Sequence, residues 1–258
     1  MRSVAPAATL KATASGNLSA IDLQGALTSG KASVSLATLV EPYAAFPVAA
    51  LKAQLQDLDL RAFAKDWPQT LLAGEMDLER TGVLLVGPVR LTNAAHGSYD
   101  RGRVPVAALR VEVRTDVSNV RAFTFDADLG RAGAVTGSGS LTSDAATVAL
   151  ATRNLDLSGV HGRMRKTRLA GRADLTLTEA QQSVAADLSQ DDINVAVTAH
   201  RAGYRVQVSQ FRARARGGEA RGSANMMLSG KRPFALQASF TRFDNLIFTR
   251  CDNPMTPL

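Results

Sequence analysis

The chain has 258 residues, of which 45% are hydrophobic but only 5% aromatic, and it carries a formal net charge of +7. Its single cysteine, Cys251, excludes a disulfide framework or a thiolate metal site within the chain. No apolar run reaches the roughly 18 residues of a membrane-spanning helix, and the first residues lack the apolar core of a signal peptide. We therefore expect any membrane anchor of the protein to lie outside this chain.

Alternation of apolar and polar residues at period two is the main pattern along the chain, and it predicts β-strands. One apolar and one polar face on each strand is typical of antiparallel strands covered on one side. Turn-forming residues such as Gly30 and Gly217 separate the runs. The sequence thus predicts an all-β fold of about fourteen to sixteen antiparallel strands. The clearest runs are residues 107–115, 168–178, 192–200, 203–211 and 233–241.

An internal repeat organises these strands. A shift of 97 residues aligns residues 58–78 with residues 155–175, and nine of the 21 positions are identical. Chance would give about one or two identities, so the repeat is genuine. Two segments that break the alternation occupy equivalent places in it, and we predict short helical turns near 60–67 and 157–164.

The repeat also predicts how the chain is divided. We expect an irregular segment at residues 1–16, a single elongated β-repeat array at 17–250 and an aberrant tail at 251–258. The repeating units of the array lie near 58–154 and 155–250.

Two motifs recur in the repeat. A strand ends in Leu-Asp-Leu before each helical turn, at 58–60 and 155–157, and Leu-Ala-Gly-x-x-Asp-Leu follows at 72–78 and 169–175. With the stretches 87–113 and 230–244, these motifs resemble the TamB branch of the AsmA-like superfamily of bacterial envelope proteins. The resemblance covers residues 17–250.

This resemblance implies an elongated, curved antiparallel β-sheet that forms a U-shaped groove. It implies a periplasmic location, as part of a protein anchored in the inner membrane, with phospholipid acyl chains as partners. The implied function is to carry phospholipids between the inner and outer membranes for outer-membrane biogenesis. The alternative is a scaffold for outer-membrane protein assembly or secretion, which works with an outer-membrane β-barrel partner through parts absent from this chain.

The candidate site is the set of apolar side chains expected to face the groove and contact acyl chains. These residues are Leu109, Val111, Val113, Leu169, Leu175, Leu177, Ile193, Val195, Val197, Val206, Val208, Phe234 and Leu236.

Patterns for covalent chemistry are weak, and we expect no enzymatic activity, no cofactor and no metal. Residues 25–32 approach a phosphate-binding loop, but the final Ser/Thr position is Ala32 and a strand pattern follows instead of a helix. The three histidines are far apart without ligand spacing. No Gly-x-Ser-x-Gly motif is present.

Basic residues gather in two places, on alternate positions 212, 214 and 216, near Arg205 and Arg221, and within 163–168. Such clusters could contact phosphate, either of lipid head groups or of nucleic acid. The alternative is a solvated outer face that discourages edge-to-edge aggregation. Few aromatic residues accompany the arginines, so we expect no nucleic-acid partner.

Overall fold

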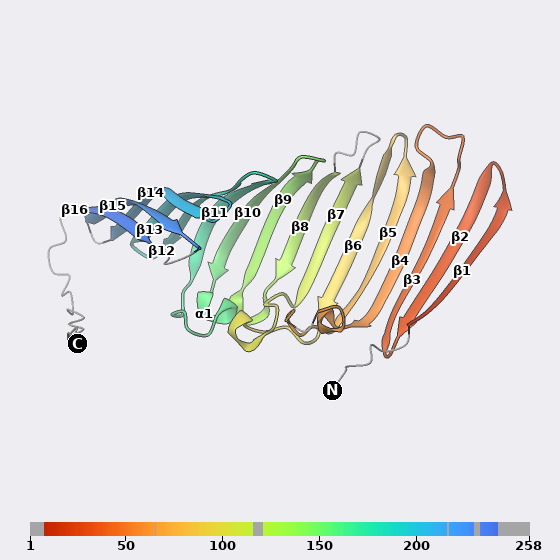
Figure 1. Ribbon diagram of the computed structural model, residues 1–258, viewed down its shortest axis with the longest axis horizontal. Coiled ribbons are helices and arrows are strands. Elements are labelled where there is room, and N and C mark those ends of the chain that lie inside the picture. Colours follow the sequence, from red (N-terminus) through yellow and green to blue (C-terminus); the bar gives the residue numbers. More distant parts are fainter. Residues whose placement is uncertain (1–7, 65, 116–120, 216, 230–232, 242–258) are drawn as a thin grey trace.

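All strands of the computed structural model belong to one antiparallel sheet. The structure describes residues 8–64, 66–115, 121–215, 217–229 and 233–241. In this part of the chain, sixteen strands pair in sequential order, each antiparallel to the next (Figure 1). The all-β class and the antiparallel arrangement predicted from the alternation are therefore confirmed.

The strands have 8 to 11 residues, and the helical elements between them are short. The strands are β1 (Ala8–Asn17), β2 (Ala20–Ser29), β3 (Ala32–Val40), β4 (Val48–Leu58), β5 (Leu72–Thr81), β6 (Leu84–Asn93), β7 (Ala108–Thr115), β8 (Arg121–Asp128), β9 (Ala134–Leu141), β10 (Ala145–Leu155), β11 (Leu169–Thr178), β12 (Gln182–Gln190), β13 (Ile193–Ala202), β14 (Arg205–Ala215), β15 (Gly218–Met227) and β16 (Phe234–Thr241). The helical elements are η1 (Leu60–Ala62), η2 (Tyr99–Arg101), η3 (Gly130–Ala132) and α1 (Leu157–Val160).

The sheet is open and uncurled. β1 and β16 are its outer strands, and no pairing joins them in the described residues. The sheet is thus less curled than the U-shaped groove that the resemblance implies. Sheets bend where β-bulges shift the register, and no shift occurs in any pairing from β5 to β10. Shifts do occur at β3–β4, β4–β5, β10–β11, β13–β14 and β14–β15. The last three lie in or next to the part of the sheet, from β11 onwards, that Figure 1 shows turned relative to the rest.

A single layer leaves much of the chain in contact with solvent. Its accessible surface is 18547 Å². A compact protein of 27.2 kDa would expose about 11,000 Å². Among the described residues, only five hydrophobic residues are buried, and three of them are alanines. The sheet therefore has no deep core of the globular kind.

Strand register decides which side chains share a face. Directly opposed residues of antiparallel strands point to the same side of the sheet. Val111 lies opposite Val89 on β6 and Phe125 on β8, whereas Glu112 lies opposite Pro88 and Thr124. We call the side in phase with Val111 the apolar face and the side in phase with Glu112 the polar face.

The connections lie at two edges. Those from odd-numbered to even-numbered strands form the hairpin edge, and those from even-numbered to odd-numbered strands form the loop edge. The connections 59–71, 94–107, 129–133 and 156–168 belong to the loop edge, and they contain every helical element of the described residues. In Figure 1 this edge is the lower one, near α1.

Thr70 ties the first helical turn to the neighbouring strands. It is only 2% exposed. Its Oγ1 accepts a hydrogen bond from the Leu60 N–H at 2.9 Å and donates to the Leu58 carbonyl at 3.2 Å. Its own N–H donates to Asp59 Oδ1 at 3.2 Å. The threonine therefore satisfies backbone groups at the strand end and at the start of η1.

Thr167 makes the same network one repeat later. Its Oγ1 accepts from the Leu157 N–H at 2.9 Å and donates to the Leu155 carbonyl at 2.9 Å. Its N–H donates to Asp156 Oδ1 at 3.1 Å. The identical residues at a spacing of 97 thus have identical structural roles. We call each network a threonine clasp.

The glycine of the Leu-Ala-Gly motif is explained by close backbone approach. A Cβ atom on Gly171 would lie 2.0 Å from the Asp187 carbonyl oxygen, and φ at this residue is +148°. At the equivalent Gly74, a Cβ would lie 2.5 Å from the Arg90 oxygen. Both positions exclude a larger side chain without a shift of the adjacent strand.

One expectation needs correction. Residues 8–16, predicted to be irregular, form most of β1. Leu10, Ala12 and Ala14 face one side of this strand, but the small alanines make the alternation weak. The short helical turns expected near 60–67 and 157–164 are present, as η1, which ends at Ala62, and α1, which ends at Val160. Residues 1–7 and the tail 251–258 lie outside the described residues.

Loss of a threonine clasp should destabilise the sheet. Thr70→Val keeps the shape of the side chain but leaves the Leu60 N–H and the Leu58 carbonyl without their partner. We expect the free energy of unfolding in urea to fall by about 1–3 kcal/mol. Thr70→Ser retains the hydroxyl and should lose clearly less. Equal losses for the two variants would contradict the role assigned to the hydroxyl.

Candidate functional site

All thirteen residues of the candidate site lie on the apolar face. Leu109, Val111 and Val113 alternate along β7 and point to the same side of the sheet. The residues paired with them across β8, β9 and β10 lead to Leu175 on β11, which therefore points to that side too. From β11 the phase continues to Val195 on β13. The other members are in phase with these on their own strands or by pairing: Leu169, Leu177, Ile193, Val197, Val206, Val208, Phe234 and Leu236.

A bulge keeps the apolar face continuous across β14. Val208 lies opposite Ala199 of β13, but Phe211 lies opposite Val197, so β14 contains one extra residue between them. Without this bulge, Phe211 would point to the polar face. The bulge therefore brings Val206, Val208 and Phe211 to one side and turns Arg212 to the other.

The apolar face extends well beyond the predicted residues. The pairings add apolar side chains from strands on both sides of β7, among them Leu51, Leu55, Met76, Val89, Leu91, Phe123, Phe125, Val148 and Leu150. The same alternation in their strands, for instance in residues 84–93 and 121–128, is the signal that could have identified them.

Two aromatic rings cover the glycines of β9. Phe123 and Phe125 lie opposite Gly139 and Gly137, and their ring centroids are 6.2 Å apart. A Cβ on Gly139 would come within 2.5 Å of the Phe123 ring, and one on Gly137 within 2.7 Å of the Phe125 ring. The Gly-Ser-Gly-Ser run thus leaves room for the two rings on the apolar face, an arrangement that stabilises glycine-containing strands.

Side chains on the apolar face remain largely accessible. Most of the thirteen predicted residues are half-buried by their neighbours within the sheet, such as Val111 and Val195. Towards β16 the exposure increases, and Phe234 is 77% and Leu236 70% exposed. Monomeric soluble proteins rarely expose an apolar surface that is continuous over so many strands. The face is therefore a candidate surface for an apolar or amphiphilic partner.

The polar face carries cross-strand ion pairs. Lys52 of β4 lies 3.2 Å from Asp77 of β5, and Glu75 lies 2.9 Å from Arg90 of β6. More than half of each of these side chains is exposed, so the pairs contribute little to stability. Their main consequence is a charged, hydrated surface opposite the apolar one.

Glu219 gathers three of the predicted arginines on this face. Arg221 hydrogen-bonds to it at 2.8 Å and Arg214 at 3.2 Å, whereas Arg212 Nε lies 2.8 Å from the carboxylate without the alignment of a hydrogen bond. The hydrogen bond from Arg221 is the main cause that lowers the pKa of Glu219 below its ordinary value. This arginine cluster thus lies on the opposite side from the apolar candidate site. Arg216 lies outside the described residues.

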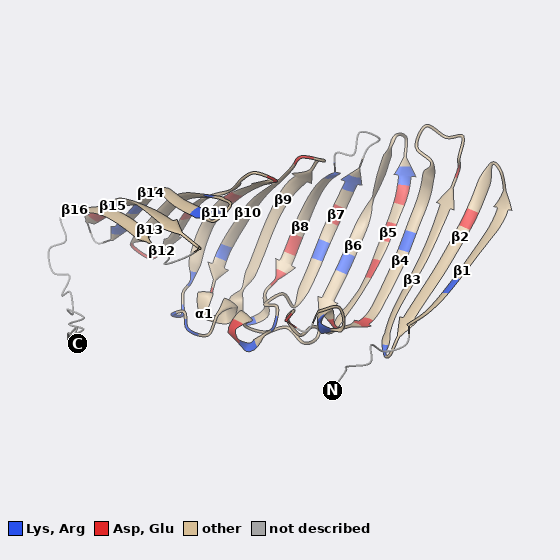
Figure 2. Ribbon diagram, in the orientation of Figure 1, with Lys and Arg blue, Asp and Glu red and all other residues tan. Residues whose placement is uncertain are grey.

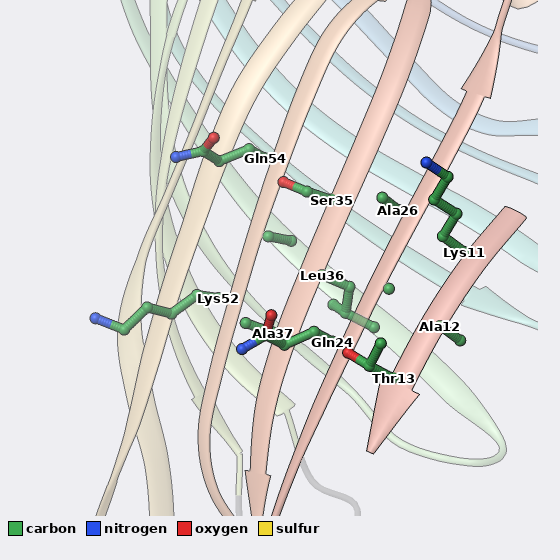
Figure 3. Close-up of a pocket in the computed structure, with 12 residues that line it drawn as sticks. Lys11, Ala12, Thr13, Gln24, Ala26, Ser35, Leu36, Ala37, Lys52 and Gln54 are labelled. Atoms are coloured by element: carbon green, nitrogen blue, oxygen red, sulfur yellow. The ribbon is translucent and has the colours of Figure 1, made fainter. Parts of the chain in front are cut away.

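Two shallow hollows open on the polar face. One, of about 430 Å³, lies on β1–β4 between rows that include Lys11, Gln24, Lys52 and Gln54. Figure 3 shows Lys52 and Gln54 projecting to the same side. The other, of about 860 Å³, lies on β7–β11 and is lined mainly by polar-face residues such as Thr124. The apolar site is therefore distinguished by its continuous exposed surface rather than by these hollows.

The described residues hold no group of three or more His, Cys, Asp or Glu side chains arranged to bind a metal ion. His96 Nδ1 lies 3.0 Å from the Asn93 carbonyl, and His200 Nε2 lies 3.2 Å from Gln207 Oε1. The helices in the same part of the chain are all too short to span a bilayer. The candidate site is thus a surface of apolar side chains.

Comparison with family models, with curated proteins and with solved structures finds no match to this chain. The family suggested by the repeat motifs therefore stays a prediction, and the functional argument depends on the geometry of the sheet.

Three carboxylates on the loop edge are held in the charged form. The Arg61 side chain is the main cause of a lowered pKa at Asp59, the Ser158 hydroxyl at Asp156 and the Gly162 N–H at Asp100. A carboxyl whose pKa is lower in the folded than in the unfolded protein stabilises the fold above its unfolded value. That contribution is lost as the pH falls through the folded pKa.

We therefore expect the loop edge to loosen in acid. The free energy of unfolding should stay level above about pH 5 and decline between about pH 4 and pH 2. Asp156→Asn should reduce the decline, as followed by urea unfolding at each pH. Asp22→Asn, at an exposed position on the polar face of β2, is the matched control. An equal effect of the two variants would contradict the assignment to the loop edge.

Proposed function

We propose that this chain is part of a protein that carries phospholipids between the inner and outer membranes, and that it holds their acyl chains on the apolar face of the sheet. The protein would be a periplasmic member of the TamB branch, anchored in the inner membrane through parts outside this chain. The proposal includes no covalent chemistry, no cofactor and no metal.

The observation that carries the proposal is the apolar face, which continues from β1 to β16 along the middle of the sheet. Arg80, Arg121 and Arg201 point to this side only near the hairpin edge. Sixteen strands at about 4.8 Å each give a surface roughly 75 Å long. Strands of 8 to 11 residues give it a width of about 26–37 Å. The acyl layer of one leaflet is about 15 Å deep, half of the hydrocarbon core, so chains that lie along a strand fit within this width.

Chemistry of the face also favours acyl chains over a specific ligand. Away from the arginines near the hairpin edge, its side chains are mainly Ala, Val and Leu, with Phe at a few positions. In this central part the side chains provide an apolar surface with few polar groups that could select one ligand. Each buried methylene of a lipid contributes roughly 0.8 kcal/mol wherever it lies. A surface of this kind supports binding that is non-specific along its length, as movement of lipids between positions requires.

A second candidate function uses the edges of the sheet. β1 and β16 each pair on one side only within the described residues. An exposed edge can accept a strand from another protein. This favours the alternative of a scaffold for outer-membrane protein assembly or secretion, with a β-barrel partner, and specificity would then depend on the backbone of β1 or β16.

Native mass spectrometry of the purified protein tests the main proposal directly. We expect phospholipids to remain bound and to dissociate when the apolar face is made polar. Protein free of lipid under conditions that preserve its β-rich circular dichroism would argue against the lipid function.

Charge on the apolar face should abolish lipid binding while the same charge on the polar face is tolerated. Leu175→Asp should weaken binding of a fluorescent fatty-acyl probe by about tenfold or more, because a carboxylate is costly in an apolar contact. Thr176→Asp, its neighbour on the polar face, is the matched control. Leu177→Asp, at a position that is 40% exposed, tests the same face with less risk to folding. Equal losses for Leu177→Asp and Thr176→Asp would show that the apolar face does not bind acyl chains.

A further inference from the structure

Three loops interlock on the loop edge between β6 and β11. The Gly162 N–H donates a hydrogen bond to Asp100 Oδ1 at 2.8 Å, although the residues are 62 positions apart. The Asp156 N–H donates to the Ala132 carbonyl at 2.9 Å. A Cβ on Gly159 would lie 2.6 Å from Ala132 N, so α1 packs closely on η3. The loops 94–107, 129–133 and 156–168 therefore form one connected surface.

This surface gathers exposed cations that lack acidic partners. None of them forms an ion pair with a described acidic side chain, and each is exposed. They are Arg101, Arg103, Arg131, Arg163, Arg165, Lys166 and Arg168. Figure 2 shows Lys and Arg along this edge, near α1. We call these seven residues the basic edge.

Acidic residues of the same loops are engaged by the backbone. Asp100 accepts the Gly162 N–H, Asp128 accepts the Gly130 N–H at 2.7 Å, and Asp156 accepts the Ser158 and Thr167 N–H groups. Their main role is to hold the loops. The positive potential of the basic edge is therefore only partly compensated.

The two edges of the sheet differ in charge. In the hairpins opposite the basic edge, the described charged residues include Asp144, between β9 and β10, and Glu179, between β11 and β12. On the polar face, by contrast, Lys52, Arg90 and Arg221 each have a carboxylate partner. Other described cations also form no ion pair with a described acidic side chain, but they are scattered over several strands. They include Arg121 and Arg201 near the hairpin edge and Lys11, Arg110, Arg114, Arg172 and Arg205 on the polar face. The basic edge differs from them because its seven cations gather on three connected loops.

The basic edge directly adjoins apolar side chains. Arg168 is followed by Leu169, the first apolar-face residue of β11, and Leu109 occupies the same end of β7. Tyr99, in the middle of these loops, is 67% exposed. Exposed tyrosines beside cations are typical of protein surfaces that meet the boundary between acyl chains and head groups.

We infer that the basic edge binds the phosphate of phospholipids whose acyl chains lie on the apolar face. This inference depends on the proposed function and extends it by fixing how the lipid lies. Head groups lie along the loop edge, and acyl tails run along the strands towards the hairpin edge. Lipids with a net negative head group bind more tightly than neutral ones.

The test compares two probes with identical short acyl chains, one a phosphatidylglycerol and the other a diacylglycerol, each used below the concentration at which it forms aggregates. The first variant combines Arg163→Gln, Arg165→Gln and Lys166→Gln. The matched control combines Lys11→Gln, Arg114→Gln and Arg205→Gln, which removes the same three charges from exposed positions on the polar face, away from the loop edge. Dissociation constants are measured by titration at low and high salt.

We expect the unchanged protein to prefer phosphatidylglycerol. The basic-edge variant should bind it roughly tenfold or more weakly, because each cation near an anionic lipid contributes about fivefold, and should bind diacylglycerol as before. The control should change either constant by less than about twofold. High salt should weaken phosphatidylglycerol binding to the unchanged protein and to the control but much less to the basic-edge variant.

Other outcomes would overturn the inference. Equal binding of the two probes by the unchanged protein would exclude a phosphate subsite while leaving acyl binding on the apolar face intact. Failure of both probes to bind would remove the proposed function itself. Displacement of phosphatidylglycerol by inorganic phosphate at the same concentration would identify a free-phosphate site. Tighter binding of a single-stranded oligonucleotide to the same cations would identify a nucleic-acid surface.

Discussion

Strand register is the constraint on which the other features of this sheet depend. Side chains alternate at period two, so a slip of one residue would send the apolar side chains of a strand to the polar face. The bulge in β14 shows how the constraint is met, since it restores the phase between Val208 and Phe211 and turns Arg212 away from the apolar face. An open sheet has no second layer to enforce the phase, and the pairings themselves must maintain it across all strands.

Polar contacts at the loop edge replace part of the missing core. Thr70 and Asn93 are among the most buried residues of the described chain, and Asn93 Oδ1 accepts the Leu71 N–H at 3.1 Å. Buried hydrogen bonds of this kind cost free energy when one partner is removed. The threonine clasps recur at the repeat spacing because each unit has the same strand end to satisfy. The loops thereby give the thin sheet one rigid border.

Local patterning predicted the strands well, and the non-local features poorly. The phase of Val111, Leu175 and Val195 follows from alternation within each strand, and pairing in sequential order then joins them on one face. β1 was harder, because alanines on its apolar side weaken the pattern. The degree of curling depends on where register shifts fall, and the contact of Asp100 with Gly162 joins loops 62 residues apart. Neither the degree of curling nor this loop contact can be read from the alternation of apolar and polar residues within a strand. The connected loops could therefore not be predicted from the sequence.

The position of each basic cluster in the sheet explains why the arginines around Glu219 and the cations of the basic edge differ in the partners that they can bind. Arginines around Glu219 lie on the polar face, where a shared carboxylate reduces their net charge and the sheet separates them from any lipid on the other side. Cations of the basic edge lie where the two faces meet, and their acidic neighbours are occupied by backbone N–H groups. A molecule with an apolar tail and an anionic head can therefore satisfy the apolar face and the basic edge at once. The arginines around Glu219 and the apolar face, on opposite sides of the sheet, cannot be used together by one such molecule.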